Sequence, residues 1–209
     1  MDKQVNRVNR IGIMGGTFDP VHYGHLVAAE GARHHFSLDV VIFVPAARPP
    51  HKGIRIITDP MHRLNMTVLA TGSNPNFEVS DLEIKRQGPS YTIETVSYFH
   101  RSWPDSQIYF ITGADAVLEI LTWHRVRELL DLCYFIAATR PGYRLENLSE
   151  TLKGLPARYI EKIAVMEVPA LAISSTDIRD RVGSGKPIKY LLPEEVENYI
   201  NHKGIYRPV

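Results

Sequence analysis

The sequence has one cysteine in 209 residues and no long apolar run. Cys133 has no partner in the chain, which argues against a disulfide framework and favours a reducing compartment; we expect it to be a small buried residue. No stretch approaches the roughly 20 apolar residues that a membrane-spanning helix needs. The polar start, Met1 to Asn9, shows no secretory signal. We therefore expect a cytoplasmic protein that does not bind membranes.

The chain also lacks an excess of charge of either sign. Its 24 Lys and Arg residues against 23 Asp and Glu residues give a net charge of +1. Proteins whose main partner is nucleic acid usually carry a large basic field, so this balance argues against that class. A triphosphate ligand remains compatible with this net charge, because binding it needs only a few basic groups. Hydrophobic residues make up 44% of the chain, which suits one globular domain over 1–209.

Two further features are missing: internal repeats and the dinucleotide-binding pattern G-x-G-x-x-G. Apolar segments of strand length alternate instead with segments of helical period. Strands are expected at 10–14, 39–45, 77–84, 107–112, 133–138 and 162–168. Helices are expected near 23–36, 60–72, 92–102, 116–131, 145–153, 175–183 and 193–203. This alternation predicts a single-domain α/β fold with a doubly wound, mostly parallel sheet and a helical C-terminal part from about 173 to 209.

The first segment that carries chemistry follows the strand expected at 10–14. Residues 15–26 read Gly-Gly-Thr-Phe-Asp-Pro-Val-His-Tyr-Gly-His-Leu. The glycines are expected to form a turn whose backbone approaches a phosphate chain, and Asp19 is expected to shape the turn and cap the next helix. His22 and His25 would share one face of that helix. A zinc site is the weaker alternative, because no third ligand is adjacent.

A second segment lies about 150 residues later, from Ile173 to Arg179, and reads Ile-Ser-Ser-Thr-Asp-Ile-Arg. Its hydroxyl side chains are typical of a helix N-terminus. The free N–H groups and the dipole of such a terminus attract anions. Alone, the segment is an ordinary capped helix, but behind the histidine pair it indicates a site for a polyphosphate.

Together the two segments resemble the H-x-G-H signature and the C-terminal block of the nucleotidyltransferase superfamily. Over nearly its whole length the chain resembles bacterial nicotinate-nucleotide adenylyltransferases. The resemblance implies a Rossmann-like fold and transfer of an adenylyl group from ATP, with Mg²⁺, to nicotinate mononucleotide. It implies catalytic roles for His22, His25 and Arg179. It implies ATP contacts from these three residues and from Gly15, Gly16, Thr17, Phe18, Ser174, Ser175 and Thr176.

Further segments resemble the acceptor site of the same family. Tyr91 and Thr92 open a helix with no lysine or arginine beside them in the sequence, and the resemblance assigns them to the pyridine carboxylate. Trp123 matches an aromatic residue that stacks on the nicotinate ring, although His124 stands where the family often has tyrosine. The remaining residues expected at the acceptor are Lys52, Gly113, Asp115 and Arg140.

The strand pattern predicts how these segments meet. Gly15 and Gly16, the loop 46–60, the residues 113–115 and the residues 140–142 each follow a predicted strand, so all should lie at the carboxyl edge of the sheet. Two other functions stay open at this point. One is the same transfer to another acceptor, such as phosphopantetheine; the other is a non-catalytic nucleotide-binding module. Homo-oligomer formation is also left open.

Overall fold

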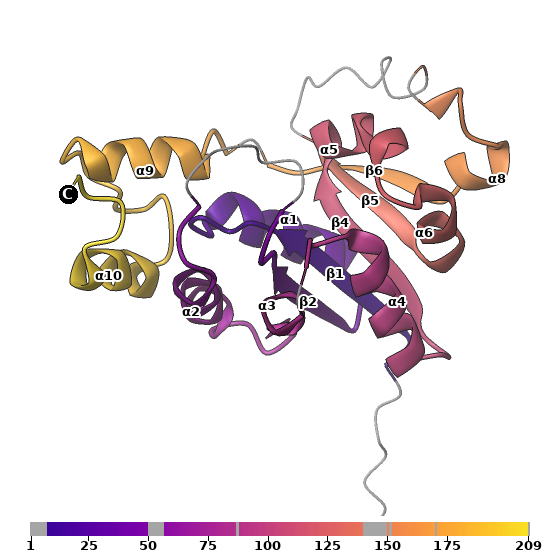
Figure 1. Ribbon diagram of the computed structural model, residues 1–209, viewed down its shortest axis with the longest axis horizontal. Coiled ribbons are helices and arrows are strands. Elements are labelled where there is room, and N and C mark those ends of the chain that lie inside the picture. The colour runs from indigo at the N-terminus through magenta and orange to yellow at the C-terminus, as the bar shows by residue number, and fades with distance from the viewer. Residues whose placement is uncertain are drawn as a thin grey trace, which may run out of the picture.

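A parallel sheet forms the centre of the protein. The computed structural model describes residues 8–49, 57–86, 88–139, 150, 152–169 and 171–208. Within this part the sheet has six strands in the order β3-β2-β1-β4-β5-β6, and every neighbouring pair is parallel. The strands are β1 (Arg10–Gly16), β2 (Val40–Pro45), β3 (Phe77–Val79), β4 (Gln107–Gly113), β5 (Tyr134–Thr139) and β6 (Ile163–Glu167). The chain winds outward from β1 to one edge and then outward from β4 to the other, which confirms the doubly wound α/β prediction (Figure 1).

Helices cover both faces of this sheet. The main ones are α1 (Tyr23–His35), α2 (Pro60–Thr71), α4 (Thr92–Ser102), α6 (Val126–Leu132), α9 (Ser175–Gly183) and α10 (Glu194–Lys203). Short ones are α3 (Leu82–Lys85), α5 (Ala114–Leu118), η1 (Ile120–Thr122) and α8 (Ala157–Ile160). Helix α10 packs beside α2, and α9 lies at the same end of the molecule (Figure 1). In the described residues, no helix combines the length and the apolar character that crossing a membrane requires.

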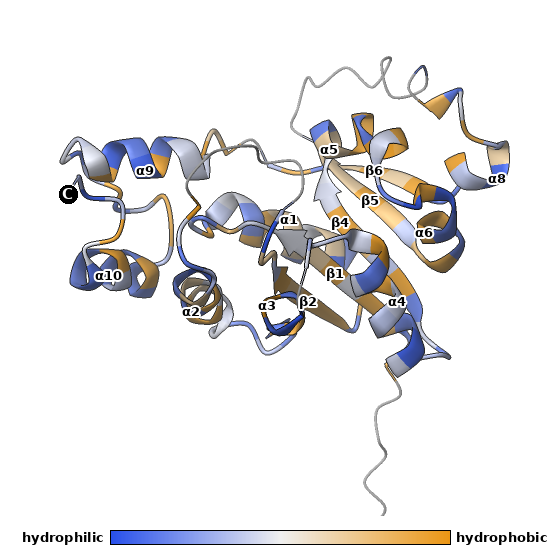
Figure 2. Ribbon diagram, in the orientation of Figure 1, coloured by the Kyte–Doolittle hydropathy of each residue, from blue (hydrophilic) through white to orange (hydrophobic). Residues whose placement is uncertain are grey.

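The core is divided by the sheet into two clusters. Ile11 and Ile13 of β1 pack with α4 and α6, whereas Met14 packs with α1, α2 and α10 on the other face. Such alternation is the normal consequence of strand geometry, and both faces are apolar because both are covered (Figure 2). Cys133 is 1% exposed, as expected, and burial raises the pKa of its thiol above the ordinary value.

The strand predicted at 77–84 is wrong in its second half. β3 ends at Val79, and the helix α3 begins at Leu82. The side-chain oxygen of Ser80 accepts a hydrogen bond of 3.3 Å from the N–H of Leu82, which starts this turn. β3 is an edge strand that pairs with β2 over three residues, so little holds the chain extended beyond it.

The single helix predicted at 116–131 is also wrong, because the segment is broken into α5, η1 and α6. Thr122 donates a hydrogen bond of 2.7 Å from its hydroxyl to the carbonyl of Glu119, an alternative to continued helix. Arg125 adopts a left-handed conformation with φ 54°. The break turns Trp123 toward a cavity described below. The short helix α8 was not predicted, and the helix predicted at 145–153 lies mostly outside the described residues.

The glycine turn predicted after residue 14 is part of the strand instead. Gly15 and Gly16 are the last residues of β1 and remain paired with β2. A Cβ on Gly15 would lie 2.8 Å from the ring of Phe110, and one on Gly16 would lie 2.8 Å from the ring of Phe18. Close packing of aromatic rings therefore explains both glycines in this structure.

Candidate active site

The larger of two neighbouring cavities opens where the direction of winding changes. Its volume is about 470 Å³. Met14 of β1, Thr112 of β4 and Thr139 of β5 lie at the carboxyl ends of three adjacent strands and line its floor. This is the usual place for a ligand in an open α/β sheet. The other lining residues are His22, Gly24, His25, Ala28, Gly113, Ala114, Asp115, Ala138, Val168, Pro169, Leu171, Ile173, Ser174 and Ser175.

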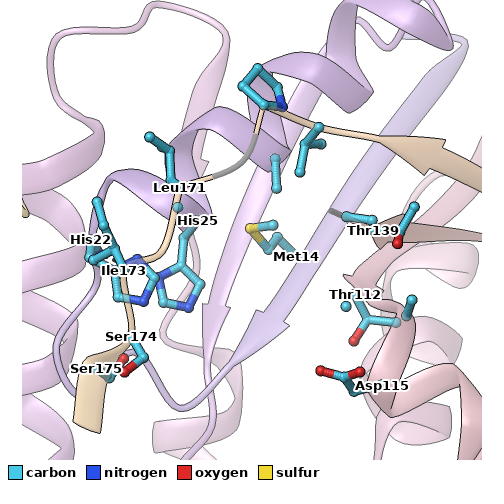
Figure 3. A pocket seen from close by; sticks show the side chains of 17 residues that line it. Met14, His22, His25, Thr112, Asp115, Thr139, Leu171, Ile173, Ser174 and Ser175 are labelled. Carbon is cyan, nitrogen blue, oxygen red and sulfur yellow. Dashed lines mark hydrogen bonds between the residues drawn. The ribbon is translucent and has the colours of Figure 1, made fainter. Parts of the chain in front are cut away.

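The two histidines stand on one side of this cavity. Their rings lie together near Ser174, while Thr112 and Asp115 lie on the opposite side (Figure 3). His22 is the N-cap of α1 and is 7% exposed, and His25 occupies the third helical position. The ring centroids are 3.9 Å apart. The prediction that both histidines lie on one side of a helix start is therefore confirmed, and both line the same cavity; their role toward a ligand stays a prediction.

A backbone contact orients the His25 ring. The N–H of His22 donates a hydrogen bond of 3.2 Å to Nδ1 of His25. A ring nitrogen that accepts has no proton, so neutral His25 carries its proton on Nε2. The edge of the Phe18 ring packs against the same imidazole at 5.1 Å between centroids. His25 thus presents one N–H donor in a fixed direction.

Asp19 does not cap α1, since that position belongs to His22. Its carboxylate is buried and accepts a hydrogen bond of 2.7 Å from the hydroxyl of Tyr206. Burial and this carboxylate together raise the pKa of Tyr206. Asp19 therefore fastens the turn before the histidines to the C-terminal segment, which agrees with its expected role in shaping that turn.

The helix start predicted at Ser174 is confirmed. Ser174 is the N-cap of α9, and its hydroxyl accepts a hydrogen bond of 3.1 Å from the N–H of Asp177. Ser175 donates from its hydroxyl to the carbonyl of Pro20 at 2.8 Å, which holds α9 against the turn after β1. The first turn of α9 therefore lies next to the histidine pair, with Ser174 and Ser175 lining the cavity.

Arg179 lies behind this first turn. One guanidinium nitrogen donates to the backbone carbonyl of Asp19. Another donates to the hydroxyl of Thr176 at 3.0 Å. The side chain is 14% exposed and is not among the residues that line the larger cavity. The structure thus places Arg179 behind the first turn of α9, where it holds the backbone of Asp19 and does not line the cavity.

The smaller cavity, of about 140 Å³, lies on the other side of the turn after β1. It brings together Tyr91, Thr92 and Trp123, three of the residues expected at the acceptor. The ring of Tyr91 stacks on that of His124 at 4.4 Å. The remaining lining residues are Gly16, Thr17, Ala46, Pro49, Ser90 and His124.

Some expected residues lie elsewhere. Gly113 and Asp115 line the larger cavity with the histidines, and not the smaller one with Trp123. Gly16 and Thr17, expected at ATP, line the smaller cavity. The Phe18 side chain is 2% exposed and belongs to the core. Lys52 and Arg140 lie outside the described residues.

A polar network that reaches from the surface to the buried Glu83 and Thr95 supports the smaller cavity. The Ser90 hydroxyl accepts hydrogen bonds from the N–H groups of Ala47 at 3.0 Å and Arg48 at 3.1 Å. It also bonds to the carboxyl group of Glu83, which accepts a second hydrogen bond of 2.5 Å from the hydroxyl of Thr95. Burial raises the pKa of Glu83, and the two hydroxyl donors act against that rise.

Sequence reasoning missed several of these residues. Thr112 and Thr139 end strands, so the strand-end rule could have identified them as lining residues. Glu83 lies in a predicted strand and Thr95 in a predicted helix, and nothing in the sequence indicated that these two side chains are hydrogen-bonded. Arg63 of α2, which is fully buried and donates to the backbone carbonyls of Thr17 and Ala47, gave no signal either, because an arginine in an amphipathic helix normally points to solvent.

No protein-held metal site is formed by the described residues, which contain no group of three or more His, Cys, Asp or Glu side chains placed to hold a metal ion. The donors of the larger cavity are mainly imidazoles, hydroxyls and backbone N–H groups at a helix start. These groups suit the phosphate oxygens of a nucleotide.

Comparisons with known proteins agree with this geometry. The cytidylyltransferase-like family model matches residues 13–181. A probable nicotinate-nucleotide adenylyltransferase of Moorella thermoacetica is 62% identical over 98% of this chain and 94% of its own length. A protein of the same name from Thermoanaerobacter sp. is 57% identical over 97% of each chain.

Solved structures share the fold. The nicotinic acid mononucleotide adenylyltransferase of Plasmodium falciparum complexed with NaAD matches with a TM-score of 0.77 at 21% identity, covering 95% of this chain and 97% of that chain. The same enzyme complexed with APC gives a TM-score of 0.76 over the same shares. From its sequence relatives, the chain belongs to the cytidylyltransferase-like family and, within it, to the nicotinate-nucleotide adenylyltransferases.

Proposed function

We propose that ATP occupies the larger cavity and nicotinate mononucleotide the smaller one. The chain transfers the adenylyl group of ATP to this acceptor, giving deamido-NAD and pyrophosphate. One observation carries the assignment of the cavities: the short segment from Met14 to His25 lines both of them. Two ligands seated there would meet at the turn that carries the histidines.

The reaction needs little covalent chemistry from the protein. An oxygen of the acceptor phosphate attacks the α-phosphorus of ATP, and the bond to the β-phosphate bridge oxygen breaks. Pyrophosphate leaves with that electron pair. A phosphate monoester is largely ionised near neutral pH, so no general base is required. The remaining barrier lies in bringing two polyanions together and in stabilising charge on the transferred group.

His25 and His22 stabilise the charge that develops on the transferred group. Nε2–H of His25 is oriented by the bond from the His22 backbone, so it donates to an α-phosphate oxygen without reorganisation. His22, packed against it at 3.9 Å, borders the same oxygens. The first turn of α9, with Ser174, Ser175 and Thr176, receives the β- and γ-phosphates. Arg179 supports that turn and adds positive charge behind it.

The two substrates are held at their other ends by different groups. Asp115, on the far side of the larger cavity from the histidines, accepts from ribose hydroxyls of ATP, which replaces its expected place at the acceptor. In the smaller cavity, Trp123 stacks on the pyridine ring. The N–H groups at the start of α4, near Tyr91 and Thr92, receive the nicotinate carboxylate. Lys52 and Arg140 remain proposals for the acceptor phosphate.

Magnesium enters as part of the nucleotide substrate. The described residues form no carboxylate cluster for it, and Mg²⁺ prefers phosphate oxygens and water together with few protein ligands. Bound to ATP, the ion would neutralise charge on the leaving pyrophosphate.

A coupled pyrophosphate-release assay tests this function. ATP is supplied with nicotinate mononucleotide, nicotinamide mononucleotide or phosphopantetheine, and the dinucleotide product is identified by mass. We expect rapid release with nicotinate mononucleotide and formation of deamido-NAD. Faster release with phosphopantetheine, or ATP binding without turnover of any acceptor, would contradict the proposal.

A further inference from the structure

Arg63 of α2 is fully buried, with 0% of its surface exposed. Its guanidinium donates three hydrogen bonds to backbone carbonyls of three different segments. Nη1 donates to Thr17 at 2.7 Å, Nε to Thr58 at 2.8 Å and Nη2 to Ala47 at 3.4 Å. These segments follow β1, precede α2 and follow β2, respectively. One side chain therefore joins three loops at the carboxyl edge of the sheet.

Burial of this charge is costly. Desolvation lowers the pKa of Arg63, and the negative charge of Asp19 opposes that shift. A buried guanidinium is retained at such a cost only where its hydrogen bonds are well satisfied, and an apolar side chain of similar size often gives equal or greater stability. Stability of the fold alone is therefore a weak reason for an arginine at this position.

Two of the three carbonyl acceptors of Arg63 lead to two walls of the smaller cavity. Thr17 itself lines one wall. Ala47 adjoins the other wall, which includes Ala46 and Ser90, and its N–H and that of Arg48 bond to the Ser90 hydroxyl. The N–H of Ser90 bonds back to the carbonyl of Arg48 at 3.0 Å. Ser90 immediately precedes the start of α4, where Tyr91 lines the cavity.

The larger cavity is not built in this way. Its lining residues include none of the three carbonyl acceptors of Arg63. Loss of the guanidinium would therefore act directly on the smaller cavity and reach the larger one only through Asp19, whose carboxylate accepts a hydrogen bond from the N–H of Thr58. This asymmetry gives the residue a measurable signature.

We infer that Arg63 is a positioning residue for the acceptor, fixing the distance between the Thr17 wall and the Ala47–Ser90 wall so that the cavity admits the flat pyridine ring. The inference rests on the proposed function, which assigns the acceptor to this cavity. Arg63 does not touch the acceptor; it acts through the backbone of both walls. Arg63 therefore affects the affinity for the acceptor and not the affinity for ATP.

Arg63→Lys is the main test, since lysine keeps the positive charge but cannot make the three hydrogen bonds of the guanidinium at once. We expect the KM for nicotinate mononucleotide to rise at least about tenfold, the scale of one lost charge-assisted hydrogen bond. The dissociation constant of a non-hydrolysable ATP analogue, from titration calorimetry, should stay within about twofold. Arg33→Lys is the matched control: Arg33 is paired with Glu30 on α1 and contacts neither cavity, so both constants should be unchanged.

Ser90→Ala keeps the test decisive if Arg63→Lys does not fold. Ser90→Ala removes the hydroxyl that accepts from the N–H groups of Ala47 and Arg48. It should therefore also raise the KM for nicotinate mononucleotide. Where both single variants fold, the double variant should raise the KM no further than the larger single effect, because both changes release one wall. Additive effects, equal weakening of ATP analogue and acceptor, or a normal acceptor KM in Ser90→Ala would overturn the inference.

Trp123→Ala separates this inference from the proposed function. If Trp123→Ala leaves the acceptor KM unchanged, the cavity has been assigned to the wrong ligand. If Trp123→Ala raises that KM and neither Arg63→Lys nor Ser90→Ala does, the cavity is correct and the positioning role is wrong.

Discussion

The backbone N–H of His22 donates to Nδ1 of His25, and the two imidazole rings pack 3.9 Å apart at the start of α1. This relationship decides which nitrogen of His25 faces the cavity with a proton. It also explains the spacing of the pair, because only the third helical position reaches back to the N-cap N–H. The geometry of a capping interaction is thus used to orient a donor.

His25→Ala should lower kcat at least ~10²-fold, the scale of losing one preorganised donor to a developing charge. The fold should persist, because His25 is only half-buried, beside the rings of Phe18 and His22. Steady-state turnover and thermal unfolding measure the two effects. His34→Ala, an exposed change later on the same helix, should match the wild type in both. Near-normal turnover by folded His25→Ala would remove the donor role.

Arg179→Ala should weaken binding of an ATP analogue and leave the acceptor KM nearly unchanged. The reason is its position: the guanidinium holds the Asp19 carbonyl and Thr176 at the phosphate end of the larger cavity. Isothermal titration measures the first effect and steady-state kinetics the second. Arg181→Ala is the control, since Arg181 pairs with Asp177 on the same helix. Loss of acceptor affinity alone would mean that the two subsites are reversed.

Nicotinate mononucleotide should be preferred over nicotinamide mononucleotide by at least about tenfold in kcat/KM. Helix-start N–H groups suit a carboxylate, whereas an amide NH₂ leaves a donor unpaired, a mismatch of roughly 1–3 kcal/mol. The sequence showed no cation beside this helix start, but the fold brings the backbone of Arg48 against Ser90. Arg48→Ala therefore belongs in the measurement. If Arg48→Ala keeps the preference for nicotinate mononucleotide, the N–H donors of the helix start are its source. If Arg48→Ala loses the preference, the Arg48 side chain is its source.

Glu83→Gln should change how stability depends on pH. The raised pKa means that folded Glu83 keeps its proton to a higher pH than the unfolded chain does. The free energy of unfolding of the wild type should therefore fall as the pH rises from 4.5, the ordinary glutamate value, through the raised pKa. Glutamine has no proton to lose, so Glu83→Gln should lack this fall.

Urea unfolding at a series of pH values measures that difference. The free energy of unfolding of Glu83→Gln, relative to that of the wild type, should increase as the pH rises above 4.5. Glu161→Gln, which alters an exposed carboxylate after α8, should follow the wild type. A constant difference between Glu83→Gln and the wild type at every pH would show that Glu83 titrates normally.

The sheet could be predicted because its signal is local. Continuous apolar runs such as that of β2 identify buried parallel strands, and their alternation with helices fixes the doubly wound class. Prediction failed where distant contacts decide the local structure. The segment 116–131 reads as one helix, yet it breaks so that Trp123 can pack edge-on to Phe110 and Phe135.

The site was predictable to the extent that its residues lie in contiguous motifs. His22, His25 and Ser174 were identified because each motif forms a helix start by itself. Asp115 was expected beside Trp123 but lines the other cavity, because sequence cannot tell which of two adjacent cavities a strand end faces. Arg63 was missed for a related reason: its three partners are backbone carbonyls, which leave no trace in side-chain patterns.

The assignment of one cavity to each substrate is tested most directly by crossed kinetics of Asp115→Ala and Trp123→Ala. Asp115 lines only the larger of the two cavities and Trp123 only the smaller. Asp115→Ala should raise the KM for ATP several-fold and leave that for nicotinate mononucleotide unchanged. Trp123→Ala should do the reverse, by about tenfold or more for loss of a stacked ring. If both variants raised the KM of the same substrate, or each raised that of the other, the two-cavity account would be contradicted.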